Sequence, residues 1–303
     1  MASNSNLHRA RTAKNDEFYT LYEDVSAELS AYAHLFQGKS VLCNCDRPES
    51  AFTRYFLDNL NTLGLTRFTA THYAPNTTRG NLLTVSAGDP APHTETLYGD
   101  GDFRSAHVSL LMMEHDIVCS NPPFSLFREY IDQLMVHGKE FAIVGNKNAL
   151  GYKNVFGYIQ ANRLWTGNHL PKKFIQPDGS TKQLGNICWF TNMPVPRLLE
   201  PIELWRKYTP EMYPRYDNYD AINVNRLCDI PVDYPGVMGV PLTYLDRHCP
   251  AQFEIVGICE NVGKGFSGGL WRKTSGVAEP MVKGNRLYSR VFIRHLNPEP
   301  PQP

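Results

Sequence analysis

The chain lacks an excess of charge of either sign and any long apolar run. Its 303 residues carry 30 Lys plus Arg against 30 Asp plus Glu, so global charge gives no argument for a nucleic-acid partner. No run reaches the roughly 18 apolar residues that a membrane span needs, so we expect no membrane partner. The apolar share of 42% is too high for a disordered chain.

The cysteines argue against a disulfide framework or a zinc site. There are seven, an odd number, and none forms a C-x-x-C pair, so we expect no metal. Residues 1–16 are polar, carry Arg9, Arg11 and Lys14, and lack the apolar stretch of a secretory signal. We therefore expect a protein of the reducing cytoplasm with a flexible, basic N-terminus over residues 1–16.

Apolar strands alternate with helical stretches over residues 17–192. The segments 41–43, 116–120 and 141–145 are apolar throughout, as in a parallel sheet with helices on both faces. Helical spacing covers 23–36, and 105–114 also reads as a helix. This order predicts an α/β fold with a doubly wound sheet. Residues 193–303 are rich in Pro, Tyr and Gly, and we expect a loop-rich region packed on that core.

The strongest chemical signal is the turn Asn121-Pro122-Pro123-Phe124. It lies between a predicted strand and a predicted helix, where open α/β sheets bind their ligands. The Asn side-chain oxygen and a rigidly held proline carbonyl can both accept hydrogen bonds from one amine. The aromatic ring can stack on the ring that carries this amine. The pattern indicates four catalytic residues that aim a planar amine at an electrophilic methyl group. A plain strand-ending turn is the alternative.

Further blocks, in the same order along the chain, resemble the adenine-specific DNA methyltransferases of the EcoRI modification-methylase type. They are residues 14–20, 42–46, 101–105, 144–149, 188–192, 216–224 and 236–241. The resemblance implies a class I methyltransferase-like (Rossmann-like) fold with S-adenosyl-L-methionine as cofactor. It implies site-specific methylation at N6 of an adenine flipped out of double-stranded DNA. It also allows a cognate restriction endonuclease, without an obligate protein partner.

The resemblance assigns roles to individual residues. Phe18, Tyr19 and Thr20 would close over the cofactor from the N-terminal side. The other expected cofactor-binding residues are Asn44 and Asp46 after the first strand, and Asp102 and Phe103 at the end of a third strand. The expected base-pocket residues are Phe124, Trp189 and Phe190.

Some of these roles have a structural alternative. Asp46 and Asp102 could each be a helix N-cap instead of a cofactor ligand. Trp189 and Phe190 are neighbours on a predicted strand and would face opposite sides, so one of them belongs to the core. Most methyltransferases of this class have a glycine-rich turn after the first strand, but residues 44–48 contain no glycine. The EcoRI-type group shares this lack.

Basic residues gather in 261–294, where seven Lys and Arg stand against one acid. Such a segment suits contact with the phosphates of DNA, although a solvated loop has the same composition. The acidic stretch 211–233 is expected to face away from phosphate. The expected DNA-binding residues are Lys172, Lys173, Lys264, Arg272, Lys273, Lys283 and Arg286.

Other functions stay open at this point. Cytosine N4, an adenine of RNA and a protein glutamine are also planar amines that such a turn could hold. The chain could instead be a non-catalytic DNA-binding or cofactor-sensing module. The intact Asn121-Pro122-Pro123-Phe124 turn argues against lost catalysis.

Overall fold

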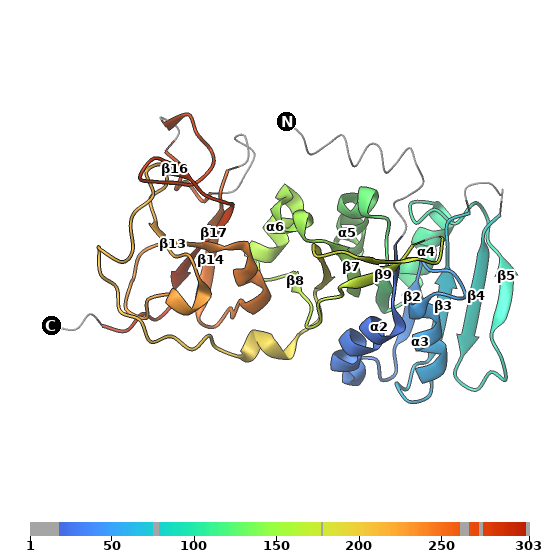
Figure 1. Ribbon diagram of the computed structural model, residues 1–303. Helices are drawn as coiled ribbons and strands as arrows, with labels where there is room; N and C mark the ends of the chain where they lie inside the picture. Colours follow the sequence, from blue (N-terminus) through green and yellow to red (C-terminus); the bar gives the residue numbers. More distant parts are fainter. Residues whose placement is uncertain (1–17, 75–78, 177, 261–266, 273–274, 301–303) are drawn as a thin grey trace. The chain divides into compact units, whose positions relative to one another are not determined.

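The computed structural model describes residues 18–74, 79–176, 178–260, 267–272 and 275–300. The chain forms two compact units (Figure 1), one of residues 1–149 with 166–195, the other of 150–165 with 196–303. Residues 150–165, which lie inside the predicted catalytic range 17–192, therefore fall in the second unit. In the described part of the chain, no helix is both long and apolar enough to cross a membrane.

The first unit is built on a mixed eight-stranded sheet with the order β5-β4-β3-β2-β6-β7-β11-β8. The parallel centre consists of β3 (Arg67–Thr71), β2 (Ser40–Cys43), β6 (Ile117–Ser120) and β7 (Glu140–Asn146). The outer strands are β5 (His93–Thr96), β4 (Asn81–Ser86), β11 (Ile187–Thr191) and β8 (Trp165–Thr166).

The expected α/β fold is confirmed, but the sheet is mixed. Strands β4, β5 and β11 each run antiparallel to a neighbour. Only residues 72–80 separate β3 from β4, and a parallel pair needs a crossover of a dozen or more residues, so β4 returns as an antiparallel neighbour.

Helices pack on both faces of this sheet. Adjacent residues of β11 point in opposite directions: Trp189 contacts Phe52, and Phe190 contacts Phe127. These partners belong to α3 (Ala51–Asn59) and α5 (Phe127–Val136), which therefore lie on opposite faces. The predicted helix 23–36 is α2 (Tyr22–Leu29) followed by the 3-10 helix η1 (Ser30–Leu35). The remaining helices are α4 (Ala106–Glu114) and the short η2 (Phe124–Leu126) and η3 (Lys147–Gly151).

A second, small sheet of this unit joins distant parts of the sequence. Strand β1 (Tyr19–Thr20) pairs with β9 (Lys173–Ile175), which pairs with β10 (Thr181–Gln183). Both pairings are antiparallel. They hold the residues just after the basic N-terminus beside a hairpin that carries three lysines.

The second unit contains a four-stranded sheet with the order β12-β13-β17-β14. Its strands are β12 (Ile222–Asn223), β13 (Met238–Pro241), β17 (Arg290–His295) and β14 (Phe253–Ile258). The hairpin β15 (Met281–Val282) to β16 (Asn285–Arg286) forms a sheet of its own. The helical elements are α6 (Lys153–Gln160), η4 (Pro196–Leu199), η5 (Leu227–Asp229) and η6 (Leu242–Arg247).

Candidate active site

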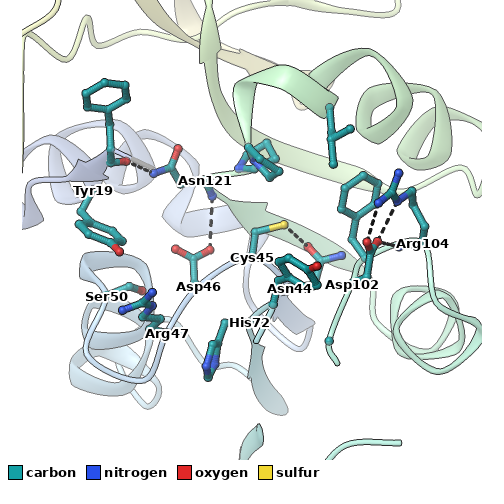
Figure 2. A pocket seen from close by; sticks show the side chains of 17 residues that line it. Tyr19, Asn44, Cys45, Asp46, Arg47, Ser50, His72, Asp102, Arg104 and Asn121 are labelled. Atoms are coloured by element: carbon teal, nitrogen blue, oxygen red, sulfur yellow. Dashed lines mark hydrogen bonds and ion pairs between the residues drawn. The ribbon is translucent and has the colours of Figure 1, made fainter. Parts of the chain in front are cut away.

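The carboxyl ends of three neighbouring strands meet at one cavity (Figure 2). Strand β2 pairs in parallel with β3 on one side and β6 on the other, so all three end at the same edge of the sheet. Asn44 follows β2, His72 follows β3 and Asn121 follows β6, and all three residues line the cavity. Open α/β sheets bind ligands at this kind of edge.

The cavity brings together most of the residues expected at the site. The expected residues that line it are Phe18, Tyr19, Asn44, Asp46, Asp102, Phe103, Asn121, Pro122 and Pro123. The residues that the sequence analysis missed are Cys45, Arg47, Ser50, His72, Tyr73, Gly101, Arg104 and Leu126. His72 and Tyr73 could have been found from the sequence, because they directly follow β3, which runs parallel to β2.

The Asn121 side chain is held by the main chain of the N-terminal strand. Its Nδ2 donates to the carbonyl oxygen of Phe18 at 2.5 Å. A carbonyl can only accept, so the amide nitrogen must face Phe18. The main-chain N–H of Asn121 donates to Asp46 Oδ2 at 3.3 Å (Figure 2). The amide oxygen is therefore left as the acceptor of this side chain.

Asp46 is a buried carboxylate beside the Asn121 turn. It is 4% exposed, and its Oδ2 accepts from the Ser120 hydroxyl at 2.6 Å. Burial raises the pKa of Asp46 to about 6, while hydrogen bonds from Ser120, Asn121 and Ser50 act in the opposite direction. The N-cap of α3 is Ser50, whose hydroxyl accepts from Thr53 N–H. Asp46 is thus not the cap of this helix.

Asn44 contributes a buried amide with an unused donor. Its side-chain oxygen accepts from the Tyr130 hydroxyl. Its Nδ2 has no hydrogen-bond partner among the described residues, although Asn44 is only 1% exposed. Leaving a buried donor unpaired costs about 1–3 kcal/mol, so this atom marks a place for an acceptor on a ligand.

Asp102 and Phe103 lie in the loop between β5 and α4, not at the end of a third strand as expected. Gly101 brings this loop against the end of β3: its φ is +82°, and a Cβ there would lie 2.1 Å from the His72 carbonyl oxygen. A hydrogen bond from Arg104, at 2.6 Å, holds the pKa of Asp102 below its usual value. The N-cap of α4 is Ser105 and not Asp102, and the lowered pKa of Asp102 keeps its carboxylate ionised at the cavity.

Comparisons with known proteins find relatives along nearly the whole chain. The family described as the adenine-specific methyltransferase EcoRI matches residues 6–296. The type II methyltransferase M.EcoRI of Escherichia coli is 40% identical over 332 aligned positions, covering 97% of each chain. M.MpnI of Mycoplasma pneumoniae is 35% identical, covering 95% of this chain and 97% of its own. No solved structure gives a significant match.

The chain belongs to the EcoRI-type adenine-specific methyltransferase family. The family resemblance and the enzyme class predicted from the sequence are thereby confirmed.

Four of the expected site residues do not line the cavity of this EcoRI-type methyltransferase. Thr20 is buried in β1, and the Phe124 ring lies 6.3 Å from that of Phe18, at an angle of 24°. Trp189 and Phe190 are fully buried against α3 and α5. The sequence analysis placed one of this pair in the core, and the structure places both there, because helices cover both faces of β11.

Two of the expected DNA-binding residues lie close to the cavity-lining strand. Lys172 and Lys173 are exposed at the start of β9, which pairs with β1. On the neighbouring strand β10, Lys182 Nζ lies 5.2 Å from the centre of the Phe18 ring. Because the Phe18 ring stacks on that of Phe124, this places positive charge close to the Asn121–Phe124 turn.

The other expected DNA-binding residues belong to the second unit. Lys283 and Arg286 are exposed on the β15–β16 hairpin, and Arg272 lies 3.7 Å from Asp220. The carboxylate of Asp217 accepts from the N–H groups of Lys283 and Gly284, so the acidic stretch holds the basic hairpin rather than lying apart from it. Lys264 and Lys273 lie outside the described residues.

Proposed function

We propose that this methyltransferase transfers a methyl group from S-adenosyl-L-methionine to N6 of a flipped adenine, at a specific site in double-stranded DNA. One observation carries the proposal: the Asn121 turn lies at the cavity that also holds the unused Asn44 donor and the Asp102 carboxylate. The family match over residues 6–296 supports adenine as the methylated base. A cognate restriction endonuclease and a cytoplasmic location remain expectations of this proposal.

The strand arrangement supports a class I methyltransferase-like, Rossmann-like core. The parallel strands run in the order β3-β2-β6-β7, so the direction of chain progression reverses between β2 and β6. Such a reversal is where open α/β sheets bind nucleotide ligands. The Asn44 and Asn121 loops leave the sheet on either side of this point.

The cavity residues fit the chemistry of the proposed cofactor. S-adenosyl-L-methionine carries a carboxylate, ribose hydroxyls and an adenine ring, and when bound it supplies the electrophilic methyl group. Asn44 Nδ2 would donate to one of its oxygens, and the ionised Asp102 would accept from a hydroxyl or amine. Phe103 would contact the adenine ring. Phe18 and Tyr19 would cover the cofactor from the N-terminal side.

The catalytic turn would hold the target amine. Asn121 Oδ1 and the Pro122 carbonyl accept the two N–H groups of the adenine amine, which turns its nitrogen lone pair toward the methyl group. The rigid prolines keep these acceptors in place before the base arrives, so the gain is mainly positioning and electrostatic preorganisation. Phe124 would stack on the base, and the amine proton leaves to solvent after transfer. Base extrusion is needed because a stacked adenine cannot reach the turn.

Two kinds of experiment separate this proposal from the alternatives. The protein is incubated with methyl-labelled S-adenosyl-L-methionine and with mixed DNA, RNA or protein, and each product is digested to its monomers. Label in N6-methyladenine from DNA supports the proposal, and sequencing for modified bases then gives the recognition site. Label in N4-methylcytosine, RNA or glutamine, or no label at all, would overturn it.

A further inference from the structure

Ser120 connects the two turns that form the floor of the cavity. It is the last residue of β6 and has no exposed surface. Its hydroxyl donates to Asp46 Oδ2 at 2.6 Å and accepts from the Cys45 N–H at 3.0 Å. The same Asp46 oxygen also accepts from the Asn121 N–H. One hydroxyl and one carboxylate oxygen therefore join the turn after β2 to the catalytic turn after β6.

Burial makes the charged form of the Asp46 carboxyl group less favourable. The raised pKa of Asp46 reflects this loss of solvation. A buried charge persists when hydrogen bonds satisfy it, and here Ser120, Asn121 and Ser50 supply them. All three donors are protein groups, and one of them is the main chain of the catalytic residue itself.

We propose that Asp46 and Ser120 are positioning residues that fix Asn121 for catalysis, and that Asp46 is not primarily a cofactor ligand. The inference rests on the proposed function, because it concerns the placement of the Asn121 amide against the target amine. With its main-chain N–H bound to Asp46 and its side-chain Nδ2 bound to Phe18, Asn121 is held at both ends. Loss of the Asp46 carboxylate frees the main-chain end of Asn121, and loss of the Ser120 hydroxyl leaves Asp46 less firmly held. A shift of about 1 Å can cost about 100-fold in rate.

Kinetics of four variants test the inference. Asp46→Ala and Ser120→Ala are expected to lower kcat by about 10- to 100-fold. The Kd for S-adenosyl-L-methionine, measured by titration calorimetry, is expected to stay within about 3-fold of wild type. Asp46→Asn keeps an acceptor oxygen and Ser120→Cys keeps a weak donor, so both should retain part of the lost rate. The double alanine variant should be no slower than the slower single one, because the two residues act as a unit.

A matched control and a readout without turnover complete the design. Asp58→Ala removes an exposed carboxylate from α3 and should leave kcat unchanged. Asp46→Ala removes the acceptor of the Asn121 N–H, so hydrogen exchange over residues 119–126 should speed up in this variant. Ser120→Ala removes the acceptor of the Cys45 N–H, so exchange over residues 43–50 should speed up there, and Asp58→Ala should change neither. Asp46→Asn keeps the side-chain volume and covers the case in which Asp46→Ala does not fold.

The outcomes separate this inference from the proposed function. A cofactor Kd that weakens in Asp46→Ala as much as kcat falls would make Asp46 a cofactor ligand and overturn the inference. So would a Ser120→Ala variant with wild-type kcat and exchange. If the wild type does not methylate DNA adenine, the proposed function fails, while the exchange data still decide whether Asp46 and Ser120 hold the turn.

Discussion

The two units of the chain fix their functional loops in different ways. In the first unit, the parallel strands β3, β2 and β6 end at one edge of the sheet. Asn44, His72 and Asn121 directly follow these strand ends and line one cavity. In the second unit, short strands and turns are held by polar side chains that bond to distant main-chain groups. Asn218 is the clearest case: its amide binds the carbonyls of Val277 and Glu279 and the N–H of Met281. The first arrangement follows from hydrophobic periodicity, and the second depends on single residues.

The largest effect is expected where the first unit presents its catalytic amide. Asn121→Ala removes the acceptor for the target amine, so kcat should fall by about 100- to 1000-fold, as for the loss of one preorganised hydrogen-bonding group. Cofactor affinity should stay near the wild-type value, because this contact is to the substrate. Methyl transfer under single-turnover conditions, together with a cofactor titration, measures both quantities.

Asn121→Asp sharpens the same test. Its carboxylate has no donor at neutral pH and would face the Phe18 carbonyl, to which Asn121 donates now. We therefore expect a loss close to that of the alanine variant, even though the general sequence pattern accepts Asn or Asp at this position. An aspartate variant as active as wild type would show that the Phe18 contact does not orient the side chain.

The second largest effect concerns the close approach of the Asp102 loop to the end of β3. Gly101→Ala combines a positive φ with a Cβ placed on the His72 carbonyl oxygen, so it should cost about 2–5 kcal/mol of unfolding free energy. Cofactor affinity should fall with it, because the loop carries Asp102 and Phe103. Urea denaturation and a cofactor titration measure the two effects.

A neighbouring glycine provides the control for this change. Gly99 also has a positive φ, of +100°, but a Cβ there meets nothing within 4 Å. Gly99→Ala should therefore show only the backbone strain, of about 1 kcal/mol. Equal losses in the two variants would mean that the contact with His72 is unimportant.

The sequence predicted the first unit far better than the second. Apolar strands, helical spacing and the Asn121-Pro122-Pro123-Phe124 turn are local patterns, and the turn does follow a strand of the sheet, as the sequence predicted. Most of the residues expected at the cofactor came from the family resemblance, and the structure brings them to one cavity, where their roles stay a prediction. What the sequence could not show is which partner each polar group takes: Asp46 lies beside Ser120, which is 74 residues away.

In the second unit, too, the contacts that hold the loops join residues far apart in the sequence. These residues follow no helical or strand periodicity that a sequence analysis could detect. The acidic stretch 211–233 is still predicted to face away from DNA phosphate, and its Asp217 accepts hydrogen bonds from the main chain of the basic hairpin 66 and 67 residues later. The charges along a sequence indicate the electrostatic potential of a surface. A carboxylate that accepts from main-chain N–H groups instead holds a loop in place, and only the three-dimensional structure shows which of the two an acidic residue does.

A smaller effect is expected where the second unit depends on one side chain. Asn218→Ala removes the hydrogen bonds to the Glu279 carbonyl and the Met281 N–H, while the Val277 carbonyl keeps those from Trp271 and Ser275. The loss should lower the unfolding free energy by about 1–3 kcal/mol. Hydrogen exchange at residues 277–284 should speed up, while exchange in β2 and β6 stays unchanged. Exchange that rises equally in both units would mean that they do not differ in the way described above.

The smallest effect concerns which unit contacts the phosphates of DNA. In the first unit, Lys172 and Lys173 are both replaced by alanine, and in the second unit, Lys283 and Arg286 are. Binding of each double variant to duplex DNA is then measured by fluorescence anisotropy at several salt concentrations. Each lost phosphate contact should reduce the slope of log K against log salt by about 0.9, so a pair that contacts two phosphates should reduce it by about 1.8. Lys207→Ala is the control, since Lys207 already pairs with Glu299 and should leave the slope unchanged.

We expect both pairs to lower the slope, with the first pair also lowering methyl transfer at saturating DNA because it lies beside the strand that holds Asn121. A pair whose removal leaves the slope at its wild-type value does not contact DNA phosphate, and if that pair is Lys283 and Arg286, the second unit does not bind DNA through its basic hairpin.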